Sequence, residues 1–163
     1  MNKIKLKNKM PKIKGKYRIV TYKAGTKEVL RTSDWINNLI MLNDNPSGLY
    51  IVLSRMIGNL DYDLEITECK VGDDDTAPTI ADTDLGNVLV EDIPPATKSR
   101  VDDDEIMISF FINDMEMPDD DYKEFGIYAG NQLIARSIIS PTYTKATGED
   151  TEFQYTITCE ATA

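Results

Sequence analysis

Three runs of consecutive aspartates, at residues 73–75, 102–104 and 119–121, are the groups best suited to chemistry in this 163-residue chain. Carboxylates that converge from loops bind hard cations such as Ca²⁺, so a shared calcium site is conceivable. None of the runs has the alternating aspartate pattern with a closing glutamate that calcium loops carry. Adjacent aspartates in a loop also point in different directions. We therefore interpret the runs as solvated loop ends and expect no bound metal.

The chain has no histidine, which removes the commonest general base and metal ligand and every Ser-His or Cys-His nucleophile. Its nine glycines are scattered and form no phosphate-binding loop. Cys69 and Cys159 stand alone, without the second motif of a zinc site or a disulfide framework. We expect both to be ordinary buried thiols. The sequence thus predicts no catalytic residues, no cofactor and no enzyme activity.

Trp35 is the sole tryptophan and stands next to Asn37 and Asn38. A tryptophan beside polar residues can form a sugar-binding platform or anchor a protein interface. The apolar neighbours Ile36 and Leu39 favour packing in the core instead. Both interpretations stay open here, and Trp35 is kept as a candidate partner-binding residue.

Charge is distributed very unevenly along the chain. Residues 1–27 hold ten lysines and arginines and no acidic residue, whereas the rest holds eight basic and all 28 acidic residues, a net charge of −20. Opposite fields on one small chain favour head-to-tail attraction between copies, or docking onto charged partners. The acidic body would repel a phosphate backbone, so we do not expect nucleic-acid binding. A small-molecule ligand is not expected either.

The first residues alternate lysine with apolar side chains, which fits a strand that adds to the sheet edge of a partner. A mobile basic tail is the alternative. Pro11 and Gly15 interrupt any longer element, so we divide the chain into a basic arm at 1–15 and a domain at 16–163. We predict that residues 1–14 act on a neighbouring subunit. The partner-binding residues expected in the arm are Lys3, Ile4, Lys5, Leu6, Lys7 and Lys9.

The domain itself reads as mostly β. Segments rich in β-branched and aromatic residues predict strands at 16–24, 28–31, 64–71, 105–112, 125–128, 133–139 and 151–160. The segment at 105–112 is nearly all apolar, as expected for a strand covered on both faces. In the segment at 151–160 apolar and polar residues alternate, as expected for a strand with one face in the core and the other in contact with solvent.

Two stretches suggest helix or turn instead. Residues 32–34 offer capping side chains before an apolar segment, and residues 49–57 have the apolar spacing of one short helix. Gly130 and Asn131 predict a hairpin turn. Many strands with one short helix indicate a single β-sandwich or jelly-roll-like domain with an extended N-terminal arm.

No apolar run reaches the roughly 18 residues that a membrane span needs. The positive N-terminus lacks the apolar segment of a signal peptide. We therefore expect a soluble protein, made in a reducing cytoplasm, with no membrane partner.

Three stretches resemble small structural proteins of tailed bacteriophages. Residues 70–89 (KVGDDDTAPTIADTDLGNVL) are similar to their loop of a strand, a glycine, a short polar run, T-A-P and D-T-x-L. Residues 15–40 resemble their Tyr-Arg strand, hairpin and W-x-x-N-L-I segment. Residues 122–141 resemble the E-x-G-(I/L)-(F/Y) and L-(I/F)-A-R hairpin of the same proteins and of tail-fibre attachment domains. One departure is the aspartate run at 73–75, where these proteins tend to carry Gly, Ser or Thr.

The resemblance implies a β-sandwich virion component of the tail, baseplate or neck, present in several copies. The expected function is a non-enzymatic structural protein that forms or anchors an appendage through contacts with copies of itself and other virion proteins. Its expected location is the virion, after synthesis in the bacterial host cytoplasm. The alternative function is a carbohydrate or host-surface binding module, with or without calcium.

Overall fold

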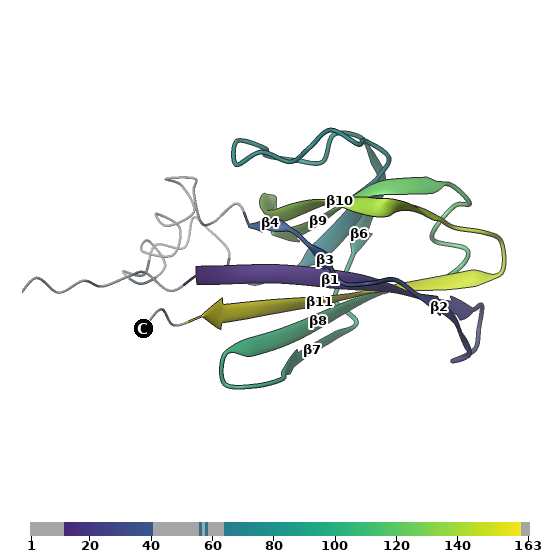
Figure 1. Ribbon diagram of the computed structural model, residues 1–163, viewed down its shortest axis with the longest axis horizontal. Coiled ribbons are helices and arrows are strands. Elements are labelled where there is room, and N and C mark those ends of the chain that lie inside the picture. Colours follow the sequence, from purple (N-terminus) through teal and green to yellow (C-terminus); the bar gives the residue numbers. More distant parts are fainter. Residues whose placement is uncertain (1–11, 41–55, 57, 59–63, 161–163) are drawn as a thin grey trace, which may run out of the picture.

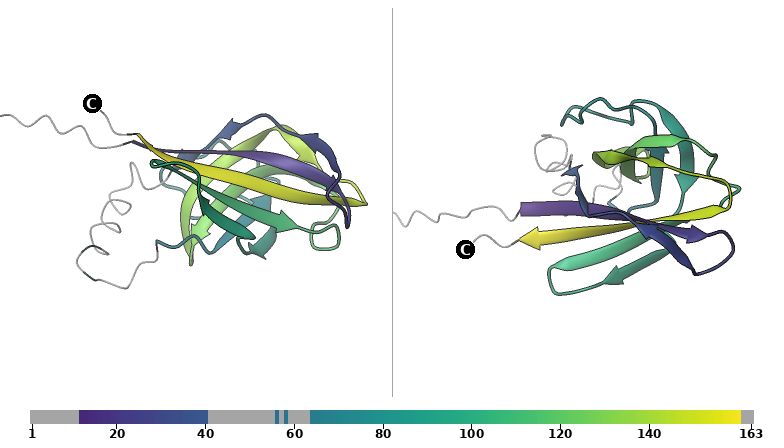
Figure 2. Two further views of the ribbon diagram at one scale, coloured as in Figure 1. Left: turned by 90° about the horizontal axis from the view of Figure 1, so that it is seen from below. Right: turned by 45° about the vertical axis from the view of Figure 1, so that its right-hand side comes forward.

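Two antiparallel β-sheets lie face to face in the computed structural model, which describes residues 12–40, 56, 58 and 64–160 (Figure 1). In sheet 1 the strand order is β2-β1-β11-β8-β7, with β3 also paired to β1. In sheet 2 the order is β4-β10-β9-β5-β6. Figure 2 shows the same two layers from two further directions. The predicted β-sandwich is confirmed.

The strands of sheet 1 are β1 (Lys12–Lys23), β2 (Val29–Thr32), β3 (Ile36–Asn37), β7 (Thr97–Arg100), β8 (Glu105–Ile112) and β11 (Glu149–Glu160). Those of sheet 2 are β4 (Leu39–Ile40), β5 (Glu68–Gly72), β6 (Val88–Ile93), β9 (Asp121–Ala129) and β10 (Gln132–Thr144). The hairpin turn predicted at Gly130 joins β9 to β10, and Gly130 has the positive φ of 58° that such a turn favours.

Aromatic side chains from both sheets meet in the core. Phe125 of sheet 2 stacks on Phe153 of sheet 1, with ring centroids 4.8 Å apart and planes 10° apart. Tyr17 lies 4.5 Å from the same Phe125 ring, and all three side chains are almost fully buried. The alternation of β1 and β11 places their large residues inward, so burial of these rings holds the sheets together.

Residues 105–112 form β8, but this strand is not covered on both faces, contrary to the expectation. Phe111 of β8 is 42% exposed because it points to the outer face of sheet 1, where its ring lies near Tyr22. No other layer of the described chain covers that face. It is β9 in sheet 2 that is buried on both faces, because the loop of residues 73–87 lies over the outer side of its sheet (Figure 1). Leu85 of this covering loop packs on Tyr128 of β9.

Residues 32–34 do not cap a helix, contrary to the expectation. The Ser33 hydroxyl accepts a hydrogen bond from the Ile19 backbone N–H (2.9 Å), and the Ser33 N–H donates to the Ile19 carbonyl (2.9 Å). These bonds hold the chain to β1, after which it crosses from sheet 1 to sheet 2 through β3 and β4. The short helix expected at 49–57 lies outside the described residues, apart from Met56.

The basic arm also lies largely outside the described residues, and with it Lys3, Ile4, Lys5, Leu6, Lys7 and Lys9. β1 begins at Lys12, so the last residues assigned to the arm pair with β11. In the described part of the chain no helix is long and apolar enough to cross a membrane.

The two cysteines are both unpaired but differ in burial. Cys69 is fully buried, as expected, and burial raises the pKa of its thiol. Cys159 is exposed, and the expectation of a buried thiol is wrong there. It pairs with the half-buried Ile13 near the end of the β1–β11 ladder, at the margin of the core.

Candidate binding groove

A groove of about 620 Å³ opens along one side of the sandwich, where β2 and the segment leading into β3 face β10. Its walls are residues 31–36 on one side and 139–144 on the other, with Ile19 and Thr21 at its base. Its volume lies in the range of pockets that receive small molecules or protruding side chains. We call it the Trp35 groove.

An irregularity in β10 forms one wall. β10 pairs with β4 only at Ala135 and Arg136, and its pairing with β9 shifts register between Ile138 and Tyr143. Residues 140–142 within this shift are exposed. Hydroxyl groups of serine and threonine therefore line the groove where the regular ladder is interrupted.

Trp35 forms part of the opposite wall and is 40% exposed, so the expectation of core packing is wrong. The reason is strand alternation: Ile36 packs against the core, which directs the preceding side chain outward. The Lys16 ammonium lies 4.8 Å and the Arg18 guanidinium carbon 4.9 Å from the indole centroid. These cations hold the ring in place through cation–π attraction.

Arg31 is held at the rim by three hydrogen bonds. It donates to both carboxylate oxygens of Glu149 (2.5 and 2.7 Å) and to the Thr144 carbonyl (2.8 Å). Its guanidinium carbon also lies 5.3 Å from the Tyr143 ring centroid. The hydrogen bonds from Arg31 lower the pKa of Glu149. A bidentate pair of this kind fixes the orientation of both side chains.

The base of the groove is a buried hydroxyl network. The Tyr143 hydroxyl lies 3.0 Å from the Thr21 hydroxyl and 2.8 Å from that of Thr151. Both threonines are fully buried. A satisfied buried network is rigid, so the Tyr143 ring presents a fixed surface to the groove.

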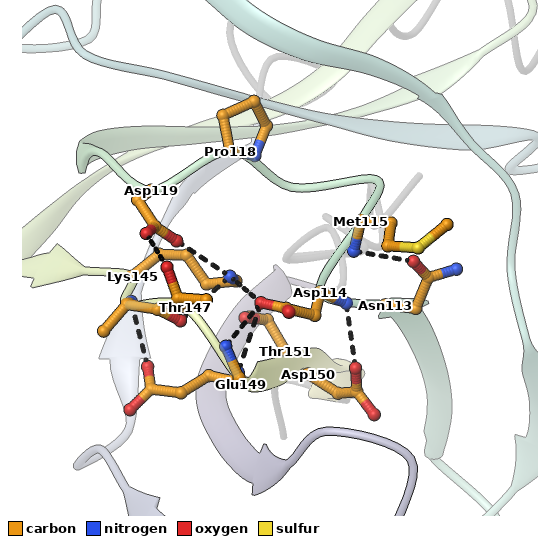
Figure 3. Close-up of polar contacts among 12 residues, drawn as sticks. Asn113, Asp114, Met115, Pro118, Asp119, Lys145, Thr147, Glu149, Asp150 and Thr151 are labelled. Atoms are coloured by element: carbon orange, nitrogen blue, oxygen red, sulfur yellow. Dashed lines mark hydrogen bonds and ion pairs between the residues drawn. The ribbon is translucent and has the colours of Figure 1, made fainter.

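Behind the rim, a fully buried lysine fixes the connection between β10 and β11 (Figure 3). Lys145 Nζ donates to Asp114 (2.6 Å), Asp119 (3.3 Å) and the Ala146 carbonyl (3.0 Å). Asp114 also accepts from the backbone N–H groups of Gly148 (2.9 Å) and of the residue that follows it (3.3 Å). Burial alone lowers the pKa of Lys145, but its hydrogen bonds to the two carboxylates outweigh this and raise it.

A second buried cluster anchors the covering loop. Glu124 is fully buried and accepts hydrogen bonds from the backbone N–H groups of Gly86 (3.0 Å) and Asn87 (2.8 Å). It also accepts from Arg136, which donates to Asp82 as well (2.6 Å). The covering loop is therefore held on sheet 2 by one ion-pair and hydrogen-bond network.

The aspartate runs do not converge. Asp74 contacts Arg136 (3.3 Å), Asp119 contacts Lys145, and Asp103 pairs with Arg100 (2.5 Å) in the turn between β7 and β8. Within residues 12–40 and 64–160, no group of three or more acidic or cysteine side chains is arranged to bind a metal ion. Two of the runs thus neutralise buried cations.

Sequence reasoning identified Trp35 but missed Arg31, Lys145 and Arg136. A usable signal existed for Arg136, because it interrupts the apolar run at 133–139 that was predicted to be a strand. A charged residue in such a run needs a buried partner. For Lys145 the surrounding sequence is polar, and no pattern marks its burial.

The groove combines a half-exposed indole, a fixed guanidinium, the Asp34 carboxylate and several hydroxyls. These groups can stack and form hydrogen bonds, which suits recognition of a partner or ligand. None of the protein-family models, curated proteins or solved structures compared with this chain matches it.

Proposed function

We propose that this chain is a non-enzymatic structural component of a tailed-bacteriophage virion. It forms or anchors a tail, baseplate or neck appendage by binding copies of itself and other virion proteins. The observation that carries the proposal is the exposed Trp35 at the edge of a groove, beside Lys16 and Arg18, with Arg31 in the same groove. Tryptophan and arginine dominate the energetic centres of protein interfaces.

The rigidity of the groove supports a role in assembly. Arg31 is fixed by Glu149, whose backbone N–H in turn donates to Asp114, the partner of Lys145. A surface that is ordered before binding loses less conformational entropy when a partner docks, which favours a stable contact.

The structural role of the buried charged residues also supports a role in assembly. Lys145 and Arg136 form ion pairs that hold loops in place, and the carboxylates that face them have the same structural role. Together with the opposite net charges of residues 1–27 and of the rest of the chain, and with the resemblance to phage structural proteins, this favours a scaffold with binding surfaces.

Incorporation into particles tests the proposal. Trp35→Ala is expected to lower the amount of the chain in purified particles at least about tenfold, as loss of a central interface residue does. Leu89→Ala is the matched control, because Leu89 is 37% exposed on the edge strand β6, away from the groove. Equal incorporation of both variants at wild-type levels would contradict the proposed role of the groove.

The second candidate function is carbohydrate or host-surface binding. It is favoured by one observation, the half-exposed indole in a groove lined by Asp34, Ser140 and Thr142. Sugars stack on aromatic faces and form hydrogen bonds to such groups. A glycan array with the isolated protein tests it: a signal that Trp35→Ala abolishes and Leu89→Ala retains would favour this function.

A further inference from the structure

We propose that copies of this chain contact one another head to tail. In this contact the acidic turn at residues 102–104 of one copy docks on the basic face of the next. The basic face is formed by Lys16, Arg18 and Trp35 on the outer side of β1. The inference rests on the proposed function and names the partner and the charges that the self-contact uses.

The basic face stands out against the charge of the domain. Residues 16 and 18 of β1 share the outer face of sheet 1, as strand alternation requires. Both cations lie within 5 Å of the Trp35 centroid, so charge and a large aromatic surface occur together. From residue 28 onward the chain carries a net charge of −20, so a cationic patch is complementary to the net charge of the rest of the chain.

Of the three acidic runs, the turn at 102–104 is the one best placed to dock on the basic face of another copy. Asp74 and Asp119 of the other two runs contact the buried cations Arg136 and Lys145. In the turn all three aspartates are exposed. Asp103 forms an ion pair with Arg100, but this pair lies at the surface, with the Asp103 side chain 96% exposed, and the turn keeps a net negative charge.

The acidic turn is also ordered before binding. The backbone N–H groups of Val101 and Asp102 both donate to the Glu105 carbonyl, at 2.9 and 3.1 Å. The Asp104 carbonyl accepts from the Cys159 N–H of β11 at 2.9 Å. The acidic turn is therefore a fixed hairpin tip, which limits the entropy lost on docking.

Sheet topology directs this contact to a neighbouring copy. β11 lies between β1 and β8, and adjacent strands are about 4.8 Å apart, so roughly 10 Å separates β1 from the strand that follows the turn. Lys16 is also level with Met107, through Thr156, so Asp104 lies three residues, about 10 Å, further along. The combined separation is too large for an ion pair within one copy. Because the two surfaces differ, the contact is heterologous and extends into a ring or a filament.

Charge reversal tests the contact, with self-association of the full chain measured by sedimentation velocity. Lys16→Glu with Arg18→Glu, and separately Asp103→Lys with Asp104→Lys, are each expected to weaken self-association at least about tenfold. The variant with all four changes restores the opposite charges across the contact and is expected to recover most of the association. Lys23→Glu with Lys27→Glu is the matched control, since both lysines are exposed near the β1–β2 turn.

Each outcome decides one question. Wild-type association that weakens with the first pair of changes but not with the second would mean that another surface fills the basic face, and the inference is wrong. Failure of the fourfold variant to recover also overturns it. If none of the variants changes the association, copies of the chain do bind one another but not through this contact, and the inference is wrong. If the wild-type chain stays monomeric at all concentrations, both the self-association and this contact are contradicted.

A salt series on the wild type serves as a second measurement that needs no variant. Exposed charges are screened beyond about 8 Å at physiological ionic strength and more strongly above it. We expect self-association to weaken several-fold between low salt and 0.5 M salt. An affinity independent of salt contradicts the inference even where a variant fails to fold.

Discussion

Lys145 Nζ lies 2.6 Å from Asp114 Oδ1, and this ion pair joins the β10–β11 connection to the loop after β8. The lysine side chain is fully buried, whereas the aspartate keeps contact with solvent at 26% exposure. Through Asp114 the pair also holds the backbone at Glu149, which fixes Arg31. The shape of the Trp35 groove therefore depends on a buried lysine outside its walls.

Replacing that lysine tests the dependence. Lys145→Met is expected to lower the free energy of unfolding by about 3 kcal/mol, the lower end for a broken buried ion pair, because the stranded carboxylates can reach water. Urea unfolding of the full chain measures this. Lys98→Met is the control: Lys98 pairs with Glu65 at the surface, and its loss should change stability far less. Equal effects of the two changes would contradict the structural role of Lys145.

Acid should weaken the same cluster. The hydrogen bond from Lys145 lowers the pKa of Asp114 below its ordinary 3.8, and the Thr147 hydroxyl, with Lys145, lowers that of Asp119. Carboxyls with lowered pKa stabilise the fold above their unfolded values, and this stabilisation is lost as pH falls through the folded values. We expect wild-type stability to fall below about pH 4. Lys145→Met should show a shallower decline, and parallel profiles would contradict this origin.

Trp35 offers a direct probe of the basic face, since it is the sole tryptophan. The positive charges of Lys16 and Arg18 beside the ring should attract anionic quenchers. We expect iodide to quench its fluorescence more efficiently than caesium, and Lys16→Glu with Arg18→Glu to reverse that order. The control pair Lys23→Glu and Lys27→Glu should leave the order unchanged. Equal quenching by both ions in the wild type would mean that the indole does not sense these cations.

The role of the basic arm stays a prediction from the sequence. Deleting residues 2–11 leaves β1 intact, because that strand begins at Lys12. We expect the truncated chain to fold with an unchanged melting temperature and to enter particles less efficiently at physiological salt. Full incorporation of the truncated chain would identify the arm as a tail without a role in assembly.

Strands with a regular pattern could be predicted from the sequence. The alternation at 151–160 and the apolar run at 105–112 correspond to β11 and β8, and Gly130 does mark the hairpin turn. Burial was harder to predict, because it depends on which sheet face receives a cover. Phe111 is exposed because nothing in the described chain covers its face of sheet 1. β9 is buried on both faces, by the core on one side and by a loop distant in sequence on the other.

The groove could be predicted only through Trp35. Its walls come from residues more than a hundred positions apart, and Arg31 meets Glu149 only because β2 pairs with β1 and β1 with β11. The crossing at β3 and β4 has the composition of a helix start, and tertiary hydrogen bonds of Ser33 to β1 decide its conformation.

Cross-linking mass spectrometry of phage particles purified from cells that produce the chain measures directly whether the chain is a virion component. We expect the chain to be present in several copies per particle. We also expect an amine-to-carboxyl reagent to link Lys16 of one copy to Asp103 or Asp104 of another. Particles that lack the chain altogether would contradict the proposed function.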